Sequence, residues 1–265
     1  MLGLPDGVTA CLFDMDGVVT RTAVVHDAAW KEMFDDFLRQ WSAQTGKEFV
    51  PFDPVRDYDE YVDGKPRLEG TSSFLESRGI SLPAGSPSDP PGTHTVHGLS
   101  NQKNDLVLAV LERDGVEVYP GSSRYIAAVR AAGLRTAIVS SSANTADVLE
   151  AGGVSDLFDV LVDASLASSR RLRGKPAPDT FLEASRMLGA AARAAAVFED
   201  ALAGVAAGHA GGFGFVTSPE RIGSYRFTVP RTWQKVGDNE LGIATTGAEG
   251  VRLWLVRIIP MEAGR

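Results

Sequence analysis

The stretch "LRTAIVSSSANTADVLEAGGVSDLFDVLVD", residues 134–163, holds a strand pattern, a helix pattern and a second strand pattern. Its apolar runs at 134–140 and 158–163 are typical of buried strands, and 144–151 has helical spacing. The same alternation is found at 122–132 (helix), 178–188 (helix), 194–200 (strand) and about 201–210 (helix). Such regular alternation predicts an α/β protein with a Rossmann-like parallel sheet that is covered by helices on both faces.

A further strand is predicted near the N-terminus, at "TACLF" (9–13), and belongs to the same sheet. Helical spacing at 23–41, 67–79 and 101–114 therefore falls within an insertion. The helical stretches are separated by a connector at 51–66 and a proline- and glycine-rich loop at 80–98. We expect residues 1–28 and 116–265 to form the core domain and residues 29–115 to form a mostly helical inserted domain.

The composition is that of an ordinary globular protein, with 44% hydrophobic residues, 23% charged residues and a net charge of −8. Because no dense Lys/Arg patch is present, nucleic acid is not an expected partner. Cys11 is the one cysteine and lies in an apolar run, which indicates core packing and excludes an intramolecular disulfide. The N-terminal residues lack a signal-peptide pattern, and no apolar run reaches the roughly 20 residues of a membrane span. We expect a cytoplasmic monomer with no membrane partner.

Residues suited to catalysis follow the predicted strands directly. They are Asp14 and Asp16 after the first strand, Ser140, Ser141 and Ser142 after the second, and Glu199 and Asp200 after "AAVF". Lys175, in "RGKPAPDTF", lies on a loop that could reach the same place. In an open α/β sheet, ligands bind at the carboxyl edge of the strands. The sequence therefore predicts that these side chains share one site.

These residue types suit phosphoryl transfer. A carboxylate can attack phosphorus, and the charge on the equatorial oxygens must then be offset by donors such as those at Ser140–Ser142 and the Lys175 ammonium. Mg²⁺ prefers carboxylate oxygens, and Asp14, Asp16, Glu199 and Asp200 can supply them. A cation lowers the repulsion between Asp14 and Asp16. Protonation of Asp16, acting as a general acid, would lower it further.

Four short motifs, in order, resemble those of the haloacid dehalogenase (HAD) superfamily: "DMDGVVT", "VSSS", "GKPAPD" and "VFEDALAGVAAG". The resemblance covers roughly residues 9–215. Within that superfamily the chain is most similar to the β-phosphoglucomutase group, through "TAVVHDAAWKEMF", "DGKPR", "NQKND" and "VYPG". Any one motif alone could be a turn, a helix cap or a solvated lysine, but the four together in order favour catalysis.

The resemblance implies specific roles. Asp14 would be the nucleophile and an Mg²⁺ ligand, and Asp16 the general acid/base with its carbonyl on the metal. Ser140 and Lys175 would hold the transferring phosphoryl group. The metal site would be completed by Glu199 and Asp200. The substrate-binding side chains would be His26, Arg67, Lys103, Asn104, Ser141, Ser142 and Asn144, with Arg67 on the non-transferring phosphate of a sugar phosphate and Thr22 and His26 at the hinge of the cap domain.

The chain departs from the group's pattern in two places. Arg21 stands where the group usually has Asp, and residues 217–265 lose the resemblance, with only "GVRLWLVRII" typical of a strand. Three functions are weighed: a Mg²⁺-dependent sugar-phosphate mutase acting through an aspartyl phosphate, a small-molecule phosphatase on the same scaffold, and a non-catalytic phosphate-binding or regulatory protein.

Overall fold

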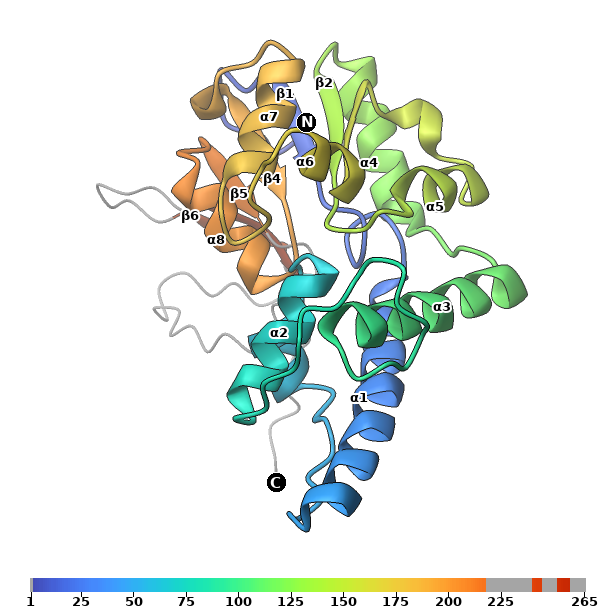
Figure 1. Ribbon diagram of the computed structural model, residues 1–265. Helices are drawn as coiled ribbons and strands as arrows, with labels where there is room; N and C mark the ends of the chain where they lie inside the picture. The colour runs from blue at the N-terminus through green and yellow to red at the C-terminus, as the bar shows by residue number, and fades with distance from the viewer. Residues whose placement is uncertain (1, 218–239, 245–251, 258–265) are drawn as a thin grey trace, which may run out of the picture.

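The computed structural model describes residues 2–217, together with the backbone of residues 240–244 and 252–257. Figure 1 shows a sheet covered by helices and, beside it, the helices α1, α2 and α3. The strands are β1 (Ala10–Phe13), β2 (Arg135–Val139), β3 (Val160–Val162), β4 (Ala195–Phe198), β5 (Phe215–Thr217), β6 (Glu240–Ala244) and β7 (Arg252–Arg257).

The helices fall into two sets. Those before the second strand are α1 (Ala23–Thr45), the short π-helix η1 (Tyr58–Val62), α2 (Arg67–Ser77), α3 (Val96–Asp114) and α4 (Pro120–Ala131). Those after it are α5 (Thr145–Ala151), η2 (Ser155–Leu157), α6 (Ala164–Ser169), α7 (Asp179–Met187), η3 (Ala192–Ala194) and α8 (Leu202–Ala210).

The main sheet has five parallel strands in the order β3-β2-β1-β4-β5, as the strand–helix alternation predicts. Successive side chains of a strand point to opposite faces. Accordingly Cys11 and Phe13 pack with Ile126 of α4 on one face, whereas Leu12 packs with Phe181 of α7 on the other. Both faces are therefore buried, and β1 lies in the middle of the core.

The helices α1, α2 and α3 enclose an apolar core of their own, built largely from aromatic rings. Phe34 lies between Trp30, Phe52 and Phe74, with ring centroids 5.3, 5.3 and 4.1 Å away. All four of these residues are buried. Aromatic contacts of this kind stabilise a core beyond the area that they bury.

Two connecting segments join the helical part to the sheet, and they lie side by side. The Tyr119 N–H donates to the Val19 carbonyl at 2.9 Å, and the Arg21 N–H donates to the Glu117 carbonyl at 2.8 Å. The Arg21 side chain also pairs with the Glu117 carboxylate at 3.1 Å. The arginine that departs from the group's pattern thus links the two segments.

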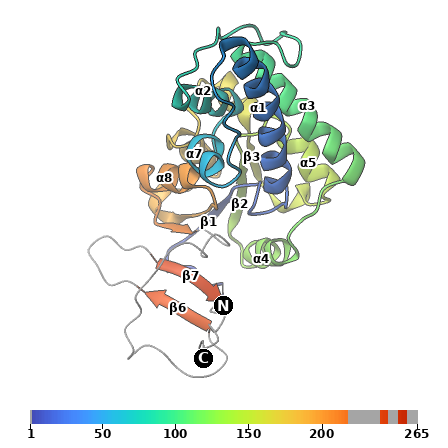
Figure 2. The same ribbon diagram turned by 90° about the horizontal axis from the view of Figure 1, so that it is seen from below.

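The predicted helices and strands of residues 9–210 are confirmed, with differences at the ends. Helix α3 begins at Val96, earlier than residue 101, because the Thr95 side chain caps it by accepting from the Gly98 N–H at 2.9 Å. The spacing missed α6 and η1, and in the tail it missed β6, which pairs antiparallel with the expected strand β7. Most of segment 217–265 lies outside the described residues. Among the described helices, none is both long and apolar enough to cross a membrane. Figure 2 gives the view from below.

Candidate active site

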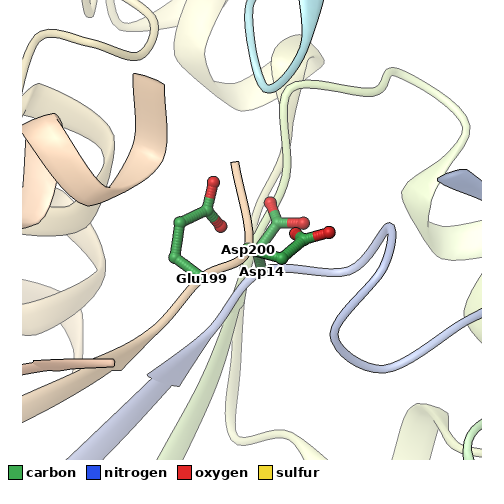
Figure 3. A group of neighbouring side chains, drawn as sticks. All are labelled: Asp14, Glu199 and Asp200. Carbon is green, nitrogen blue, oxygen red and sulfur yellow. The ribbon is translucent and has the colours of Figure 1, made fainter. Parts of the chain in front are cut away.

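The parallel register of the sheet brings Asp14 and Glu199 to the same edge. Phe13 of β1 is paired with Phe198 of β4, so the next residue of each strand emerges beside the other. The Asp14 N–H donates to the Phe198 carbonyl at 2.9 Å and continues the ladder. Figure 3 shows the carboxylates of Asp14, Glu199 and Asp200 gathered where β1 and β4 end.

The buried Lys175 side chain contacts two of these acids. Its ammonium donates to a carboxylate oxygen of Asp14, to Glu199 Oε2 at 3.3 Å and to the Val139 carbonyl at 3.1 Å. Its side chain is 1% exposed. Burial alone would lower the pKa of Lys175, but the charges of Asp14 and Glu199 outweigh it and raise that pKa. The amine therefore remains an ammonium.

Burial has the opposite effect on the pKa values of the acids. It raises the pKa of Asp14 to about 6, with the nearby Asp16 charge adding to the rise and Lys175 opposing it. Burial and the Asp14 charge also raise the pKa of Glu199 well above its usual value. Removing charged groups from water disfavours their ionised forms, so these acids need a further positive charge to remain ionised together.

Asp16 points away from this group, toward Thr22 and His26. The Thr22 hydroxyl donates to its carboxylate, and His26 Nε2 lies 3.4 Å from the same oxygen. Burial raises the pKa of Asp16, but the charge of His26 and the hydrogen bonds from His26 and Thr22 outweigh it and lower the pKa to about 2. In this arrangement the pKa of Asp16 is lowered, whereas the pKa values of Asp14 and Glu199 are raised. The protonated, general-acid form of Asp16 stays a prediction.

The relay from Asp16 continues onto α3. Lys103 Nζ lies 2.6 Å from His26 Nδ1, so the imidazole ring connects Asp16 to Lys103. Lys103 is buried and lies 4.8 Å over the Trp30 ring. Burial lowers the pKa of Lys103 to about 7, with Asp16 opposing and Arg67 adding to the fall. The role of Trp30 was not anticipated from the sequence, since its spacing is that of a core residue.

The loop after β2 presents a chain of hydroxyl groups. Ser140 Oγ accepts from the Ser142 N–H, and Ser142 Oγ accepts from the Asn144 N–H, both at 3.1 Å. The Asn144 side chain then donates to the Asn104 side-chain oxygen of α3 at 3.1 Å. Two residues that were expected to bind substrate thus contact each other between the sheet and the helices.

A pocket of about 450 Å³ collects most of the sequence-predicted residues. Its lining includes Asp14, Asp16, His26, Arg67, Lys103, Asn104, Ser140, Ser141, Ser142 and Asn144. Lys175 and Glu199 are buried, and the Lys175 ammonium donates to both Asp14 and Glu199. Residues separated by more than 100 positions in the chain therefore line one space between the sheet edge and the helices.

Comparison with known proteins identifies the family. The family model of haloacid dehalogenase-like hydrolases matches residues 8–212. The chain belongs to the haloacid dehalogenase-like hydrolase family. It is thus an HAD-superfamily enzyme, and the non-catalytic alternative is set aside.

The relatives of this HAD-like hydrolase include β-phosphoglucomutases. That of Mycobacterium bovis is 54% identical over 223 residues, which cover 84% of this chain and 85% of the relative. That of Bacillus subtilis is 28% identical over 198 residues, covering 75% and 77%. A crystal structure of β-phosphoglucomutase from Clostridium difficile shares the fold, with a TM-score of 0.61, 23% identity and coverage of 80% and 84%.

The acids of this HAD-like hydrolase fit a divalent cation. One carboxylate oxygen from each of Asp14, Glu199 and Asp200 lies within 4.8 Å of the others. Glu199 Oε1 is buried and has no hydrogen-bond partner in the described part of the chain. A Cβ atom added to Gly204 would lie 1.8 Å from that oxygen, so only a glycine leaves room for it. Hard oxygen donors of this kind suit Mg²⁺.

The helical side of the pocket carries the opposite charge. Arg67 begins α2, and its Nε is buried without a hydrogen-bond partner among the residues that the structure describes. Burial lowers its pKa, and the charge of Asp105 opposes this fall. With Lys103 beside it, this side of the pocket offers positive charge to an anion.

Proposed function

We propose that this enzyme is a sugar-phosphate mutase of the β-phosphoglucomutase type. It interconverts β-glucose 1-phosphate and glucose 6-phosphate through a bisphosphate and an aspartyl phosphate on Asp14. The substrate class follows from the 54% identical relative, whose name is β-phosphoglucomutase.

The observation that carries the proposal is that one pocket has a carboxylate nucleophile on one side and a buried, incompletely paired arginine on the other. A phosphatase needs to hold only the phosphate that it removes. A mutase must hold a second phosphate while the first is transferred, and Arg67 and Lys103 supply the charge for it. Charge-assisted hydrogen bonds to phosphate are roughly twice as strong as neutral ones.

The ionised state of Asp16 suits a cycle that starts with phosphorylated Asp14. A sugar hydroxyl attacks the phosphorus, the bond between phosphorus and the Asp14 oxygen breaks, and Asp16 accepts the hydroxyl proton. In the second half, Asp14 attacks the other phosphate of the bisphosphate, and Asp16 returns the proton to the leaving sugar oxygen. The lowered pKa keeps Asp16 unprotonated, which is the state from which the first half starts.

The other residues hold the phosphoryl group in line. Lys175 donates to Asp14, and Ser140, Ser142 and Asn144 line the same pocket as Asp14 from one loop. Asp14, Glu199 and Asp200 would hold Mg²⁺, which supplies positive charge against the phosphate oxygens when bound. His26 and Lys103 keep Asp16 oriented through the relay described above.

The proposal includes two domains, with residues 29–115 as a cap over the core of 1–28 and 116–265. The separate aromatic core of α1–α3 and the paired connecting segments support this division. Because the pocket is lined from both parts of one chain, a monomer can complete it. We further propose that the enzyme works in the cytoplasm on a small phosphorylated sugar.

The test is the conversion of β-glucose 1-phosphate to glucose 6-phosphate in the presence of Mg²⁺ and a glucose bisphosphate primer. A coupled dehydrogenase assay measures glucose 6-phosphate, and a parallel assay measures free phosphate. We expect isomerisation to exceed phosphate release. Free phosphate as the only product would instead assign the phosphatase function. The absence of both products would contradict both functions.

A further inference from the structure

The loop of residues 63–66, which joins η1 to α2, rests directly on the loops that carry the catalytic groups. The Ser141 hydroxyl donates to the Gly64 carbonyl at 2.7 Å. Gly64 has a φ of +69°, which favours glycine, and an added Cβ would lie 2.8 Å from the Cβ of Ala201. The cap therefore touches the core through backbone and small side chains.

A second contact lies at Gly174. A Cβ atom added there would lie 2.1 Å from Cγ and 2.7 Å from Cδ of Pro66, but 3.5 Å from its Cβ. Gly174 is not among the residues with positive φ, so alanine would meet no backbone strain at this position. The absence of a side chain at Gly174 is thus what allows the Pro66 ring to approach.

Each contact is adjacent in sequence to a group of the proposed site. Ser141 follows Ser140, Gly174 precedes Lys175, and Pro66 precedes Arg67. A movement of the loop away from the core would therefore carry Arg67 away from the phosphate that it is proposed to hold. It would also open the pocket to water above Asp14.

We propose that Ser141, Gly174, Gly64 and Pro66 form a closure latch, and that this latch sets how phosphorylated Asp14 is divided between a sugar hydroxyl and water. The proposal rests on the proposed mutase function. Ser141 acts here as a positioning residue through its hydroxyl, and Gly174 acts by leaving room.

The two fates of phosphorylated Asp14 differ only in the attacking oxygen. With the latch closed, a sugar hydroxyl attacks phosphorus, the bond to the Asp14 oxygen breaks, and the proton passes to Asp16. With the latch open, water attacks in the same way, Asp14 is regenerated as a carboxylate and inorganic phosphate leaves. Because a closed pocket excludes water, the ratio of phosphate release to isomerisation measures how far the latch is open.

Ser141→Ala removes one neutral hydrogen bond, so we expect that ratio to rise about two- to tenfold. The matched control is Ser77→Ala, because the Ser77 hydroxyl also donates to a backbone carbonyl at 2.7 Å, that of Phe74, within the cap itself. A purely structural effect would lower both activities together in either variant. Only the loss of the latch changes their ratio.

Gly174→Ala should raise the ratio more, by about tenfold or greater, since the clash with Pro66 forbids the closed contact unless the loop moves. Pro66→Ala in the same chain removes Cγ and Cδ and leaves a Cβ at an ordinary contact distance, so the double variant should recover at least part of the lost isomerisation. Gly121→Ala is the control, because an added Cβ there meets nothing within 4 Å.

Hydrogen exchange of the amides in residues 63–67 gives a second readout that does not depend on turnover. We expect faster exchange in Ser141→Ala and Gly174→Ala, slower exchange again on adding Pro66→Ala, and wild-type exchange in both controls. Unchanged exchange and an unchanged ratio would overturn the latch while wild-type isomerisation still supports the mutase. Wild-type phosphate release without isomerisation would defeat the mutase, and exchange would then decide the latch by itself.

Discussion

The two sides of the pocket carry opposite charges. On the core side, Asp14, Glu199 and Asp200 crowd together, and Lys175 offsets part of their charge. On the cap side, Arg67 and Lys103 are cations whose pKa values are lowered by burial. The acids need a cation and the cap-side bases need an anion, so a metal–phosphate ligand satisfies both sides at once.

The two sides of the pocket are also proposed to act on different parts of the substrate. In the proposed reaction, groups on the core side contact the phosphorus that is transferred, and their loss should lower kcat. Groups on the cap side are proposed to hold the part of the substrate that does not react, and their loss should raise KM. Changing one side at a time therefore tests whether the division holds.

The largest effect is expected from Asp14→Ala on the core side. Without the nucleophile no aspartyl phosphate forms, and kcat should fall by about 10⁴-fold or more, to the limit of detection. The fold should survive, because Lys175 keeps its contacts with Glu199 and Val139. The measurement is the coupled assay together with urea unfolding. Residual turnover near that of the wild type would transfer the nucleophile role to another residue.

Asp16→Asn should be next in size. The amide keeps the shape of the side chain but cannot accept the hydroxyl proton, so kcat should fall by roughly 10²–10⁴-fold with little change in KM. Single-turnover phosphorylation of Asp14, followed by mass spectrometry, separates the proton-transfer step from binding. A rise in KM with kcat preserved would show that Asp16 acts in binding and would break the proposed division.

The cap side is tested by Arg67→Gln. Losing a charge-assisted contact with the second phosphate should raise the KM for the bisphosphate primer by about 10- to 100-fold, with a much smaller change in kcat. Arg39→Gln, on the exposed Arg39–Asp36 pair of α1, is the matched control and should leave KM at the wild-type value. An equal fall of kcat in Arg67→Gln would mean that both sides of the pocket act on the transferring group.

The core side was predictable from sequence, and the cap side much less so. Asp14, Ser140 and Glu199 follow buried strands, and a parallel sheet brings the ends of its strands to one edge. The spacing of hydrophobic residues carries that information directly. In contrast, the pairing of Lys103 with His26 joins positions 77 residues apart on packed helices, where periodicity gives no register.

Close contacts were the least predictable feature. The "DGKPR" motif indicated a role for Arg67, but nothing local shows that Pro66 lies against Gly174, because both residues are equally typical of ordinary loops. The lowered pKa of Asp16 was not predictable for a related reason. Its pKa depends on Thr22 and His26 from the start of α1, which the chain brings back over the sheet edge.

The smallest effect is expected on the free energy of unfolding. It measures how much the burial of the Lys103 ammonium on the cap side destabilises the fold. The pKa of Lys103 is about 7 in the folded protein against 10.5 as the ordinary value. Between those values the unfolded state binds a proton that the folded state has lost, so wild-type stability should rise with pH across this window. In Lys103→Met that contribution is absent. The variant should be more stable than the wild type below pH 7, by about 1–3 kcal/mol, and the difference should shrink toward pH 10.

Urea unfolding of the ligand-free enzyme at pH 6, 7.5 and 9 measures this difference, and the exposed Lys47 provides the control as Lys47→Met. Subtracting the wild-type value at each pH removes the contributions of the core-side acids, which both proteins share. A difference that stays constant with pH, or a variant that is less stable at pH 6, would mean that the relay to His26 and the contact with Trp30 stabilise the charged amine more than burial opposes it. The Lys103 ammonium would then be stable without a bound anion. Arg67 would be the remaining evidence that the cap side binds an anion.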